Sequence, residues 1–242
     1  MRYGWIFGAA ISAIIVAMPL VYADNAECGR IEDYVYEDGK SNVIVANRNA
    51  GKQVALTFDD GPSGNYTPMI LDILAENGVK GTFFVVGRNA ERYPMILKRI
   101  HSEGHEIGNH TYSHPDMKKL TPEQLDEEIS RTGKAVSDIV GVSPVLFRPP
   151  GGYLSNDIVD KITSNSCKTV LWSWRQDTMD WKCPDVEKVV ETVLSNIRDG
   201  DIILFHDFNP GKSPTPEALK IIIPELLGRG YEFVTVSELV NM

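Results

Sequence analysis

The sequence is short of several features that would each point to a specialised class of protein. It has three cysteines among 242 residues, so at most one disulfide can form within the chain. Lysine and arginine total 24 against 33 acidic residues, which gives a formal net charge of −9. No basic cluster indicates a nucleic-acid interface, and the acidic balance disfavours binding to anionic lipid. A neutral or cationic polymer is therefore the better partner on grounds of charge.

Long apolar runs and internal repeats are also scarce. No low-complexity stretch or repeat appears, and the one long uncharged run is Trp5–Val21, which follows Arg2. Small residues two positions apart, Val21 and Ala23, resemble a signal-peptidase site, so residues 1–23 are predicted to be a secretory signal peptide. An uncleaved anchor is the alternative, although the run is short for a membrane span of roughly 20 residues. The protein is therefore expected to be secreted or associated with the cell envelope.

Export would place the cysteines where a disulfide can form. Cys167 and Cys183 flank one segment and are the favoured pair. The alternative is that these two and Cys28 are all unpaired thiols.

The rest of the chain is predicted to be a leader, residues 24–50, followed by one domain, residues 51–242. The leader is polar and contains one short strand, expected at Asn42–Ala46. From Lys52 onward, strand-like and helix-like segments alternate, which indicates an α/β fold with a mostly parallel sheet, either open or closed into a barrel. Strands are expected at 54–58, 81–87, 105–110, 145–148, 169–173, 201–205 and 231–236, and helices at 67–77, 90–103, 121–140, 155–164, 184–197 and 215–228.

Two histidines four residues apart, His110 and His114, form the first candidate for a metal site. On a helical turn both imidazoles would face the same way and could bind one cation. Taken alone they could equally be surface histidines. A zinc site needs a third ligand, often a carboxylate, and leaves one position for water.

Asp59 and Asp60, which end the apolar run 54–58, offer that carboxylate. Adjacent acids at a strand end repel each other, and a cation relieves the repulsion. Neighbouring residues on an extended backbone point in opposite directions, so only one of the two is expected to bind the metal, which leaves the other free to act as a base. The plain alternative is an Asp-Asp-Gly turn on the surface.

Two further candidates, Arg148 and His206, also follow strand-like runs. Arg148 begins the segment Arg148-Pro149-Pro150-Gly151-Gly152, and His206 follows the apolar run Ile202–Phe205. The carboxyl ends of parallel strands meet at one edge of a sheet, where active sites collect. The layout therefore predicts that Asp59, Asp60, His110, Arg148 and His206 lie at one edge.

Five segments resemble, in order, the five motifs of the NodB-like polysaccharide deacetylases, also called carbohydrate esterase family 4. They are Thr57–Gly61, His110–Pro115, Arg148–Gly152, Asp177–Trp181 and Leu204–His206. The resemblance covers roughly residues 50–240. It implies a distorted (β/α) barrel with fewer strands than the regular eightfold one.

The resemblance also implies a role for each residue. Asp60, His110 and His114 are expected to hold a divalent metal, with zinc the favoured ion, although cobalt, nickel or manganese would also suit these ligands. Asp59 is expected to be the general base and Arg148 its orienting partner. Asp180 is expected to hold and tune His206, the general acid. Trp181 and Leu204 are expected to form walls of the acetyl pocket, and Gly151 to supply a backbone N–H to the oxyanion.

One position departs from the commonest family pattern. The third motif often carries an aromatic residue where this chain has Gly151, so the backbone donor is kept but a ring beside the substrate groove is lost. Tyr153 is the residue expected to replace that ring in part. The departure bears on which glycan is preferred and leaves the type of reaction unchanged.

The sequence thus predicts a secreted, metal-dependent enzyme that removes N-acetyl groups from the amino sugars of a polysaccharide such as peptidoglycan or chitin. One alternative is an O-acetyl esterase acting on acetylated xylan, because the same chemistry serves an ester. The other is a carbohydrate-binding envelope protein without activity, although every ligand and acid/base position is present.

Overall fold

The computed structural model describes residues 43–242. The predicted signal peptide, most of the predicted leader and Cys28 lie outside the described residues. Within residues 43–242 no helix is both long enough and apolar enough to cross a membrane.

The core of the molecule is a curled sheet whose strand ladders are all parallel. Its strands run in the order β1-β6-β5-β4-β3-β2-β7, and β8 pairs separately with β2. The two end strands approach each other where Ala46 and Asp201 form a single antiparallel bridge. The strands are β1 (Val43–Ile44), β2 (Gln53–Asp59), β3 (Thr82–Val85), β4 (Glu106–Asn109), β5 (Leu146–Phe147), β6 (Lys168–Val170), β7 (Ile202–His206) and β8 (Glu232–Phe233).

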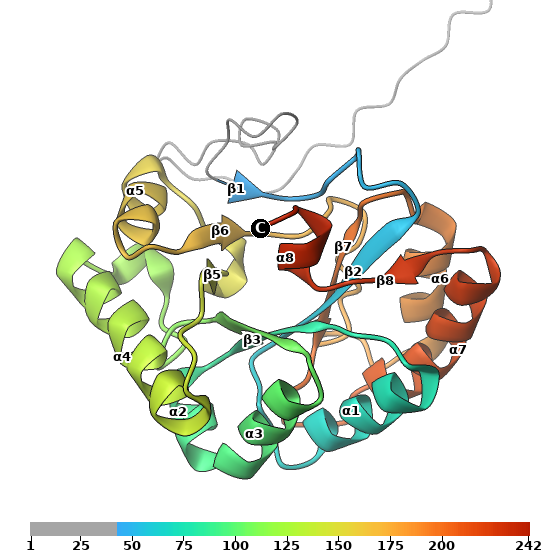
Figure 1. Ribbon diagram of the computed structural model, residues 1–242, viewed down its shortest axis with the longest axis horizontal. Coiled ribbons are helices and arrows are strands. Elements are labelled where there is room, and N and C mark those ends of the chain that lie inside the picture. The colour runs from blue at the N-terminus through green and yellow to red at the C-terminus, as the bar shows by residue number, and fades with distance from the viewer. Residues whose placement is uncertain (1–42) are drawn as a thin grey trace, which may run out of the picture.

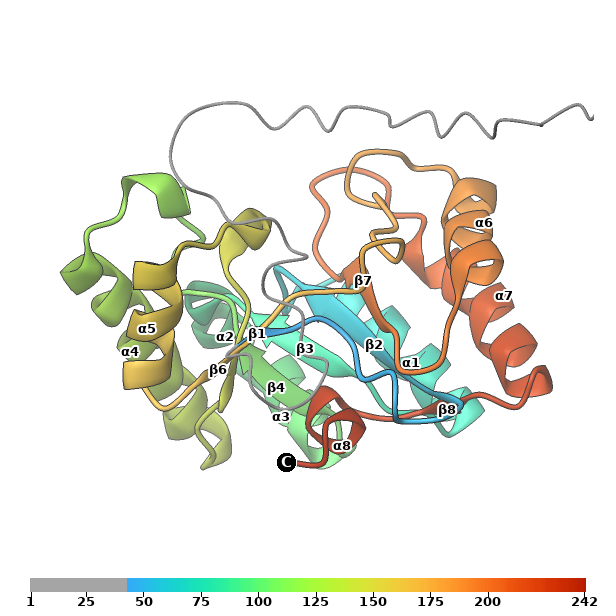
Figure 2. The same cartoon turned by 90° about the horizontal axis from the view of Figure 1, so that it is seen from above.

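Helices surround this sheet, as Figures 1 and 2 show. The long helices cover the outer face of the sheet. The short helix α8 follows β8 near the C-terminus, close to the amino-terminal end of β2 with which β8 pairs. The helices are α1 (Tyr66–Asn77), α2 (Gly87–Arg92), α3 (Pro94–Ser102), α4 (Pro122–Val140), α5 (Asn156–Ser164), α6 (Val186–Asn196), α7 (Thr215–Gly228) and α8 (Val236–Leu239). The predicted distorted (β/α) barrel is confirmed.

Alternation along β2 and β7 separates the two faces of the sheet. Phe58 and Phe205 join the large outer cluster against the helices, whereas Ala55 and Ile202 join a second, inner cluster. Because successive side chains of a strand point to opposite faces, Asp59 shares the inner face with Ala55, and His206 shares it with Ile202. Asp59 is paired with His206 in the β2–β7 register, so the alternation brings the predicted base and acid side by side.

Most of the predicted elements are present, with ends that differ by a few residues. The helix predicted from Thr121 is confirmed, including the reciprocal capping box between Thr121 and Gln124. The single helix predicted at 90–103 is wrong, because Pro94 disfavours a helical conformation at Tyr93 and divides the segment into α2 and α3. The strand predicted at 231–236 is shorter, since Thr235 caps α8 and ends the extended backbone.

The favoured disulfide is also wrong: Cys167 and Cys183 are both unpaired. Cys167 is buried and directly precedes β6, at the amino-terminal edge of the sheet. Cys183 follows Asp180 in the loop that contacts the carboxyl end of β7. The two thiols therefore lie toward opposite ends of the strands.

Candidate active site

The predicted chemical residues gather at the carboxyl-terminal edge of the sheet. Asp59 and His206 are the last residues of β2 and β7, and Asp60 follows β2 directly. His110 and Arg148 immediately follow the neighbouring strands β4 and β5, and the Arg148 N–H donates to the Asn109 carbonyl at 2.9 Å. The site is thus built mainly from strand ends, which hold side chains more rigidly than loops do.

Three side chains converge as the predicted metal ligands. Asp60 Oδ1 lies 3.1 Å from His114 Nε2 and 3.4 Å from His110 Nε2. One ligand atom from each residue lies within 4.8 Å of the others. Asp60 Oδ1 is buried and accepts no hydrogen bond from residues 43–242, which an anionic oxygen tolerates when a cation is its partner. This donor set of two imidazoles and one carboxylate fits a divalent metal such as zinc.

The ionisation state of Asp60 is also suited to binding a metal. Burial of its carboxyl opposes ionisation, but His110 and His114 outweigh this effect and lower the pKa of Asp60 far below its usual value. The carboxylate is therefore ionised at any physiological pH and is ready to bind a cation.

His110 is oriented by its backbone surroundings. Its Nδ1 lies 2.7 Å from the carbonyl oxygen of Arg148. Because a carbonyl oxygen can only accept, Nδ1 carries the proton and donates it, and the lone pair of Nε2 is left free. Such a partner on the far nitrogen is typical of a histidine that binds a metal.

The helical turn predicted to align His110 and His114 is wrong. The segment after β4 is a loop in which Thr111 has φ = 65° and His114 has φ = 55°. The two rings still approach, with centroids 5.1 Å apart, because the left-handed residues fold the chain back on itself and Thr111 Oγ1 accepts from the His114 N–H. Asp60 is also left-handed, with φ = 77°, and strained positions of this kind cluster at functional sites.

Asp59 and Arg148 form a buried ion pair beside the triad. The Arg148 side chain is completely buried, and its Nη1 donates to Asp59 Oδ1 at 2.8 Å and to Thr57 Oγ1 at 2.9 Å. Nη2 donates to the Leu171 carbonyl, and the guanidinium lies 4.1 Å from the centroid of the Phe84 ring. Burial lowers the pKa of Arg148, and the charge of Asp59 opposes that change. Both partners are therefore held in one orientation, and Asp59 Oδ2 faces His110 Nε2 at 3.9 Å.

Asp180 and His206 form a second pair. Asp180 Oδ1 accepts from His206 Nδ1 at 2.7 Å, while Oδ2 accepts from the His206 backbone N–H and from Thr215 Oγ1. Because Asp180 is buried, its hydrogen bonds fix the orientation of the His206 imidazole. They use Nδ1, so Asp180 does not contact Nε2. Burial lowers the pKa of His206, but the bond to Asp180 and its charge outweigh burial and raise the pKa to about 9.

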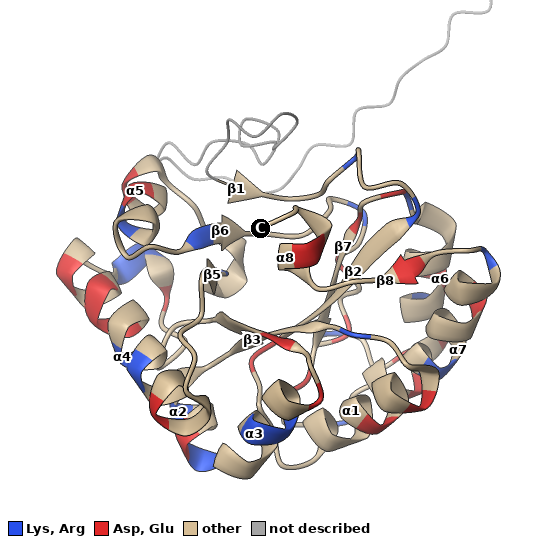
Figure 3. Ribbon diagram, in the orientation of Figure 1, with Lys and Arg blue, Asp and Glu red and all other residues tan. Residues whose placement is uncertain are grey.

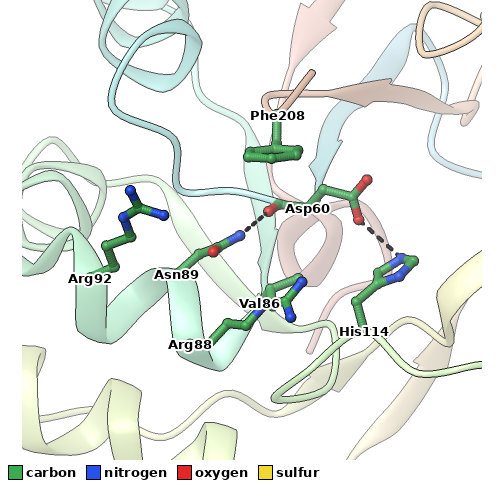
Figure 4. Close-up of a pocket in the computed structure, with 7 residues that line it drawn as sticks. All are labelled: Asp60, Val86, Arg88, Asn89, Arg92, His114 and Phe208. Carbon is green, nitrogen blue, oxygen red and sulfur yellow. Dashed lines mark hydrogen bonds and ion pairs between the residues drawn. The ribbon is translucent and has the colours of Figure 1, made fainter. Parts of the chain in front are cut away.

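An open cavity of about 480 Å³ leads to the triad (Figure 4). Asp60 and His114 lie at one end of the group, with the Phe208 ring above the Asp60 backbone. The Asn89 amide donates to the Asp60 carbonyl at 2.7 Å, which ties α2 to the strained loop. The remaining lining residues are Val86, Arg88 and Arg92.

The four residues predicted to contact substrate do not all lie in one environment. Gly151 is exposed with φ = 64°, and an added Cβ there would meet nothing within 4 Å. Trp181 is 53% exposed in the loop after Asp180, and Leu204 is buried on the same face of β7 as His206. Tyr153 lines a separate cavity of about 170 Å³ beside Lys118, not the cavity of the triad. The roles of these four residues in substrate binding remain predictions.

The sequence reasoning missed Asp207. Its carboxyl is fully buried, Oδ2 accepts from Thr67 Oγ1, and Oδ1 has no hydrogen-bond partner within residues 43–242. A Cβ on Gly61 would come within 2.1 Å of this carboxylate, so only glycine fits there. Burial raises the pKa of Asp207 to about 7, although the Thr67 bond opposes the rise. The only sequence signal was an acid directly after His206.

Comparisons with known proteins agree with this geometry. The family model described as polysaccharide deacetylase matches residues 46–170. A peptidoglycan-N-acetylglucosamine deacetylase of Bacillus cereus is 44% identical over 193 residues, which cover 80% of this chain and 90% of that protein.

Solved structures give the same result. The Bc1960 peptidoglycan N-acetylglucosamine deacetylase superposes with a TM-score of 0.78 at 37% identity, over 86% of this chain and 94% of that one. A family 4 acetyl xylan esterase from Clostridium thermocellum, in complex with a cobalt ion, has a TM-score of 0.72 at 40% identity, over 78% and 91% of the two chains. The chain therefore belongs to the NodB-like polysaccharide deacetylases, carbohydrate esterase family 4.

Proposed function

We propose that this polysaccharide deacetylase is a secreted, metal-dependent enzyme that hydrolyses the N-acetyl groups of amino sugars, releasing acetate and leaving a free amine on the polymer. The observation that carries the proposal is the arrangement of one metal triad between two buried charge pairs at the same edge of the sheet. Peptidoglycan is the favoured polymer, because relatives named for that substrate match most of the chain.

The metal would be held by Asp60, His110 and His114. When bound, a divalent cation polarises the acetyl carbonyl and makes water more acidic. Zinc is the favoured ion for this donor set, and the cobalt of the Clostridium esterase structure is in line with a site that accepts more than one metal.

Asp59 is proposed to act as the general base. Its Oδ1 is occupied by Arg148, so Oδ2 is the oxygen that accepts the proton of the attacking water. Arg148 cannot move without losing four hydrogen-bond acceptors in a buried site, and this immobility keeps the Asp59 carboxylate aimed at the reaction.

His206 is proposed to act as the general acid. With Nδ1 bound to Asp180, its Nε2–H donates a proton to the sugar nitrogen as the carbon–nitrogen bond breaks, so that the nitrogen leaves as an amine. The raised pKa keeps this imidazole protonated at neutral pH. The Gly151 N–H, which the family motif places near the carbonyl oxygen, is proposed to stabilise the negative charge that develops there.

The esterase alternative is supported by the similarity to the acetyl xylan esterase. An alkoxide leaves more easily than an amine, so an ester would depend less on His206. The binding-only alternative is disfavoured because every ligand and acid/base side chain is present and oriented.

Acetate release by the purified chain tests the proposal. It is measured on peptidoglycan, a chitooligosaccharide and acetylated xylan, with chelator and after metal is restored. We expect release from an N-acetylated substrate that stops with chelator and returns with zinc. Release from xylan alone would replace the proposal with the esterase, and no release from any metal-loaded sample would contradict it.

A further inference from the structure

Two arginines in the cavity beside the triad have no acidic partner. Arg88 and Arg92 lie four residues apart on α2, so they share one side of the helix, and both line the cavity together with Asp60 and His114. In Figure 4 the Arg88 side chain extends from α2 toward His114, while Arg92 lies beyond Asn89. Within residues 43–242 no ion pair joins either guanidinium to an acid.

The nearest acid along the helix is engaged elsewhere. Glu91 Oε2 accepts from the Tyr112 hydroxyl at 2.7 Å, and the Arg131 guanidinium lies 3.6 Å from the centroid of the same Tyr112 ring. Arg92 packs over Tyr93 at 5.3 Å, which limits the positions its guanidinium can take. The two positive charges are thus left available to the cavity.

The positive charge of this pair differs in sign from the net charge of the chain, although the Asp60 carboxylate lines the same cavity. The chain as a whole carries a formal charge of −9, and Lys and Arg are interspersed with Asp and Glu over the outer helices (Figure 3). A metal bound by Asp60 and His114 would add further positive charge to the same cavity. Arg88 and Arg92 are both exposed, and like charges on one side of a helix repel each other, so binding of an anionic group by both would be favourable.

We propose that Arg88 and Arg92 form an anion subsite that binds a carboxylate carried by the sugar next to the one deacetylated. The inference rests on the proposed function and narrows its substrate to a carboxylated glycan. In peptidoglycan the N-acetylmuramic acid unit carries such a group, either its lactyl carboxylate or a carboxylate of the attached peptide, whereas chitin is neutral. Arginine suits this role because its planar guanidinium binds a carboxylate through two parallel hydrogen bonds.

The test compares three tetrasaccharides of alternating N-acetylglucosamine and N-acetylmuramic acid. One has free lactyl carboxylates, one has them converted to methyl amides, and one carries the peptide stem. Each is given to the metal-loaded wild type, to Arg88→Gln, to Arg92→Gln and to the double variant. A variant with Lys98→Gln and Lys168→Gln, both exposed and lining neither cavity, controls for the loss of two positive charges.

In the double variant we expect the KM for the free acid to rise roughly tenfold, with kcat unchanged, because exposed charge pairs contribute modestly to binding. The KM for the methyl amide should stay within about twofold of the wild type. A matching loss with the peptide-bearing substrate would identify peptide carboxylates as a second source of the anion. A loss limited to the free acid would assign the subsite to the lactyl group.

Equal losses on free acid and methyl amide, or a double variant that keeps the wild-type preference, would overturn the inference and leave the proposed function intact. Release from the chitooligosaccharide but from none of these three would also overturn the inference, and release from no N-acetylated substrate would mean that the proposed function fails instead. Calorimetric binding of the uncleaved free acid would then test the arginines directly, because weaker binding in the double variant alone would still support the subsite and unchanged binding would refute it.

Discussion

The two charge pairs that flank the triad use the same carboxylate chemistry with different partners. Asp59 faces Arg148, a completely buried cation that stays charged throughout the physiological pH range, whereas Asp180 faces His206, whose charge can change. The base side thus has a fixed electrostatic environment, and the acid side has a titratable one. The difference matches the tasks proposed for them, since one carboxylate must stay ionised and one imidazole must give up a proton.

The largest effect should come from breaking the base side. Asp59→Asn keeps the size of the side chain and the metal ligands but removes the basic oxygen, so turnover should fall by roughly 10²–10⁴-fold with the metal retained. Acetate release and metal content, measured on one preparation, check both parts. Normal turnover in this variant would remove Asp59 from the reaction.

Replacing His206 should slow the hydrolysis of amides more than that of esters. His206→Gln should lower N-acetyl hydrolysis by roughly 10²-fold or more but O-acetyl hydrolysis much less, because only the amine must be protonated to leave. Matched N-acetyl and O-acetyl substrates give the ratio. Equal losses on the two substrates would argue against His206 as the proton donor.

A smaller effect is expected from replacing Asp180, which should change how activity depends on pH. His206 must be protonated to act, so activity should decline as pH rises through its pKa of about 9. Asp180→Asn removes the charge that raises this pKa, so the decline should move toward the ordinary histidine value of 6.5. The pH dependence of kcat/KM for the two proteins measures the shift, and an unmoved alkaline limb would contradict the role of Asp180.

The smallest effect is expected at Asp207, which lies outside both pairs. Its folded pKa of about 7 exceeds the ordinary value of 3.8, so the stability from its protonated form is complete below pH 3.8 and is lost as pH rises through 7. Asp207→Asn resembles the protonated carboxyl at every pH. We therefore expect its melting temperature to exceed that of the wild type by a few degrees at pH 8 but to match it near pH 4. A difference independent of pH would contradict this explanation.

The sequence predicted the order of elements and the edge of the sheet that carries the site, because apolar runs ending in Asp59 or His206 are local features. The helix break at Tyr93 was missed although Pro94 is a local signal for it, because the helical pattern continues on both sides of the proline. Nor could the sequence predict how His110 and His114 meet, since two residues with positive φ, Thr111 and His114, shape that loop. Asp207 was missed because its burial depends on Thr67 and Gly61, which are distant in sequence.

The central claim is that a metal held by Asp60, His110 and His114 joins the two sides into one site. Zinc titration of metal-free wild type and of His114→Ala, followed by acetate release from each, tests it most directly. We expect one zinc per wild-type chain together with activity, and loss of both when His114 is replaced. Undiminished zinc binding by His114→Ala would contradict it.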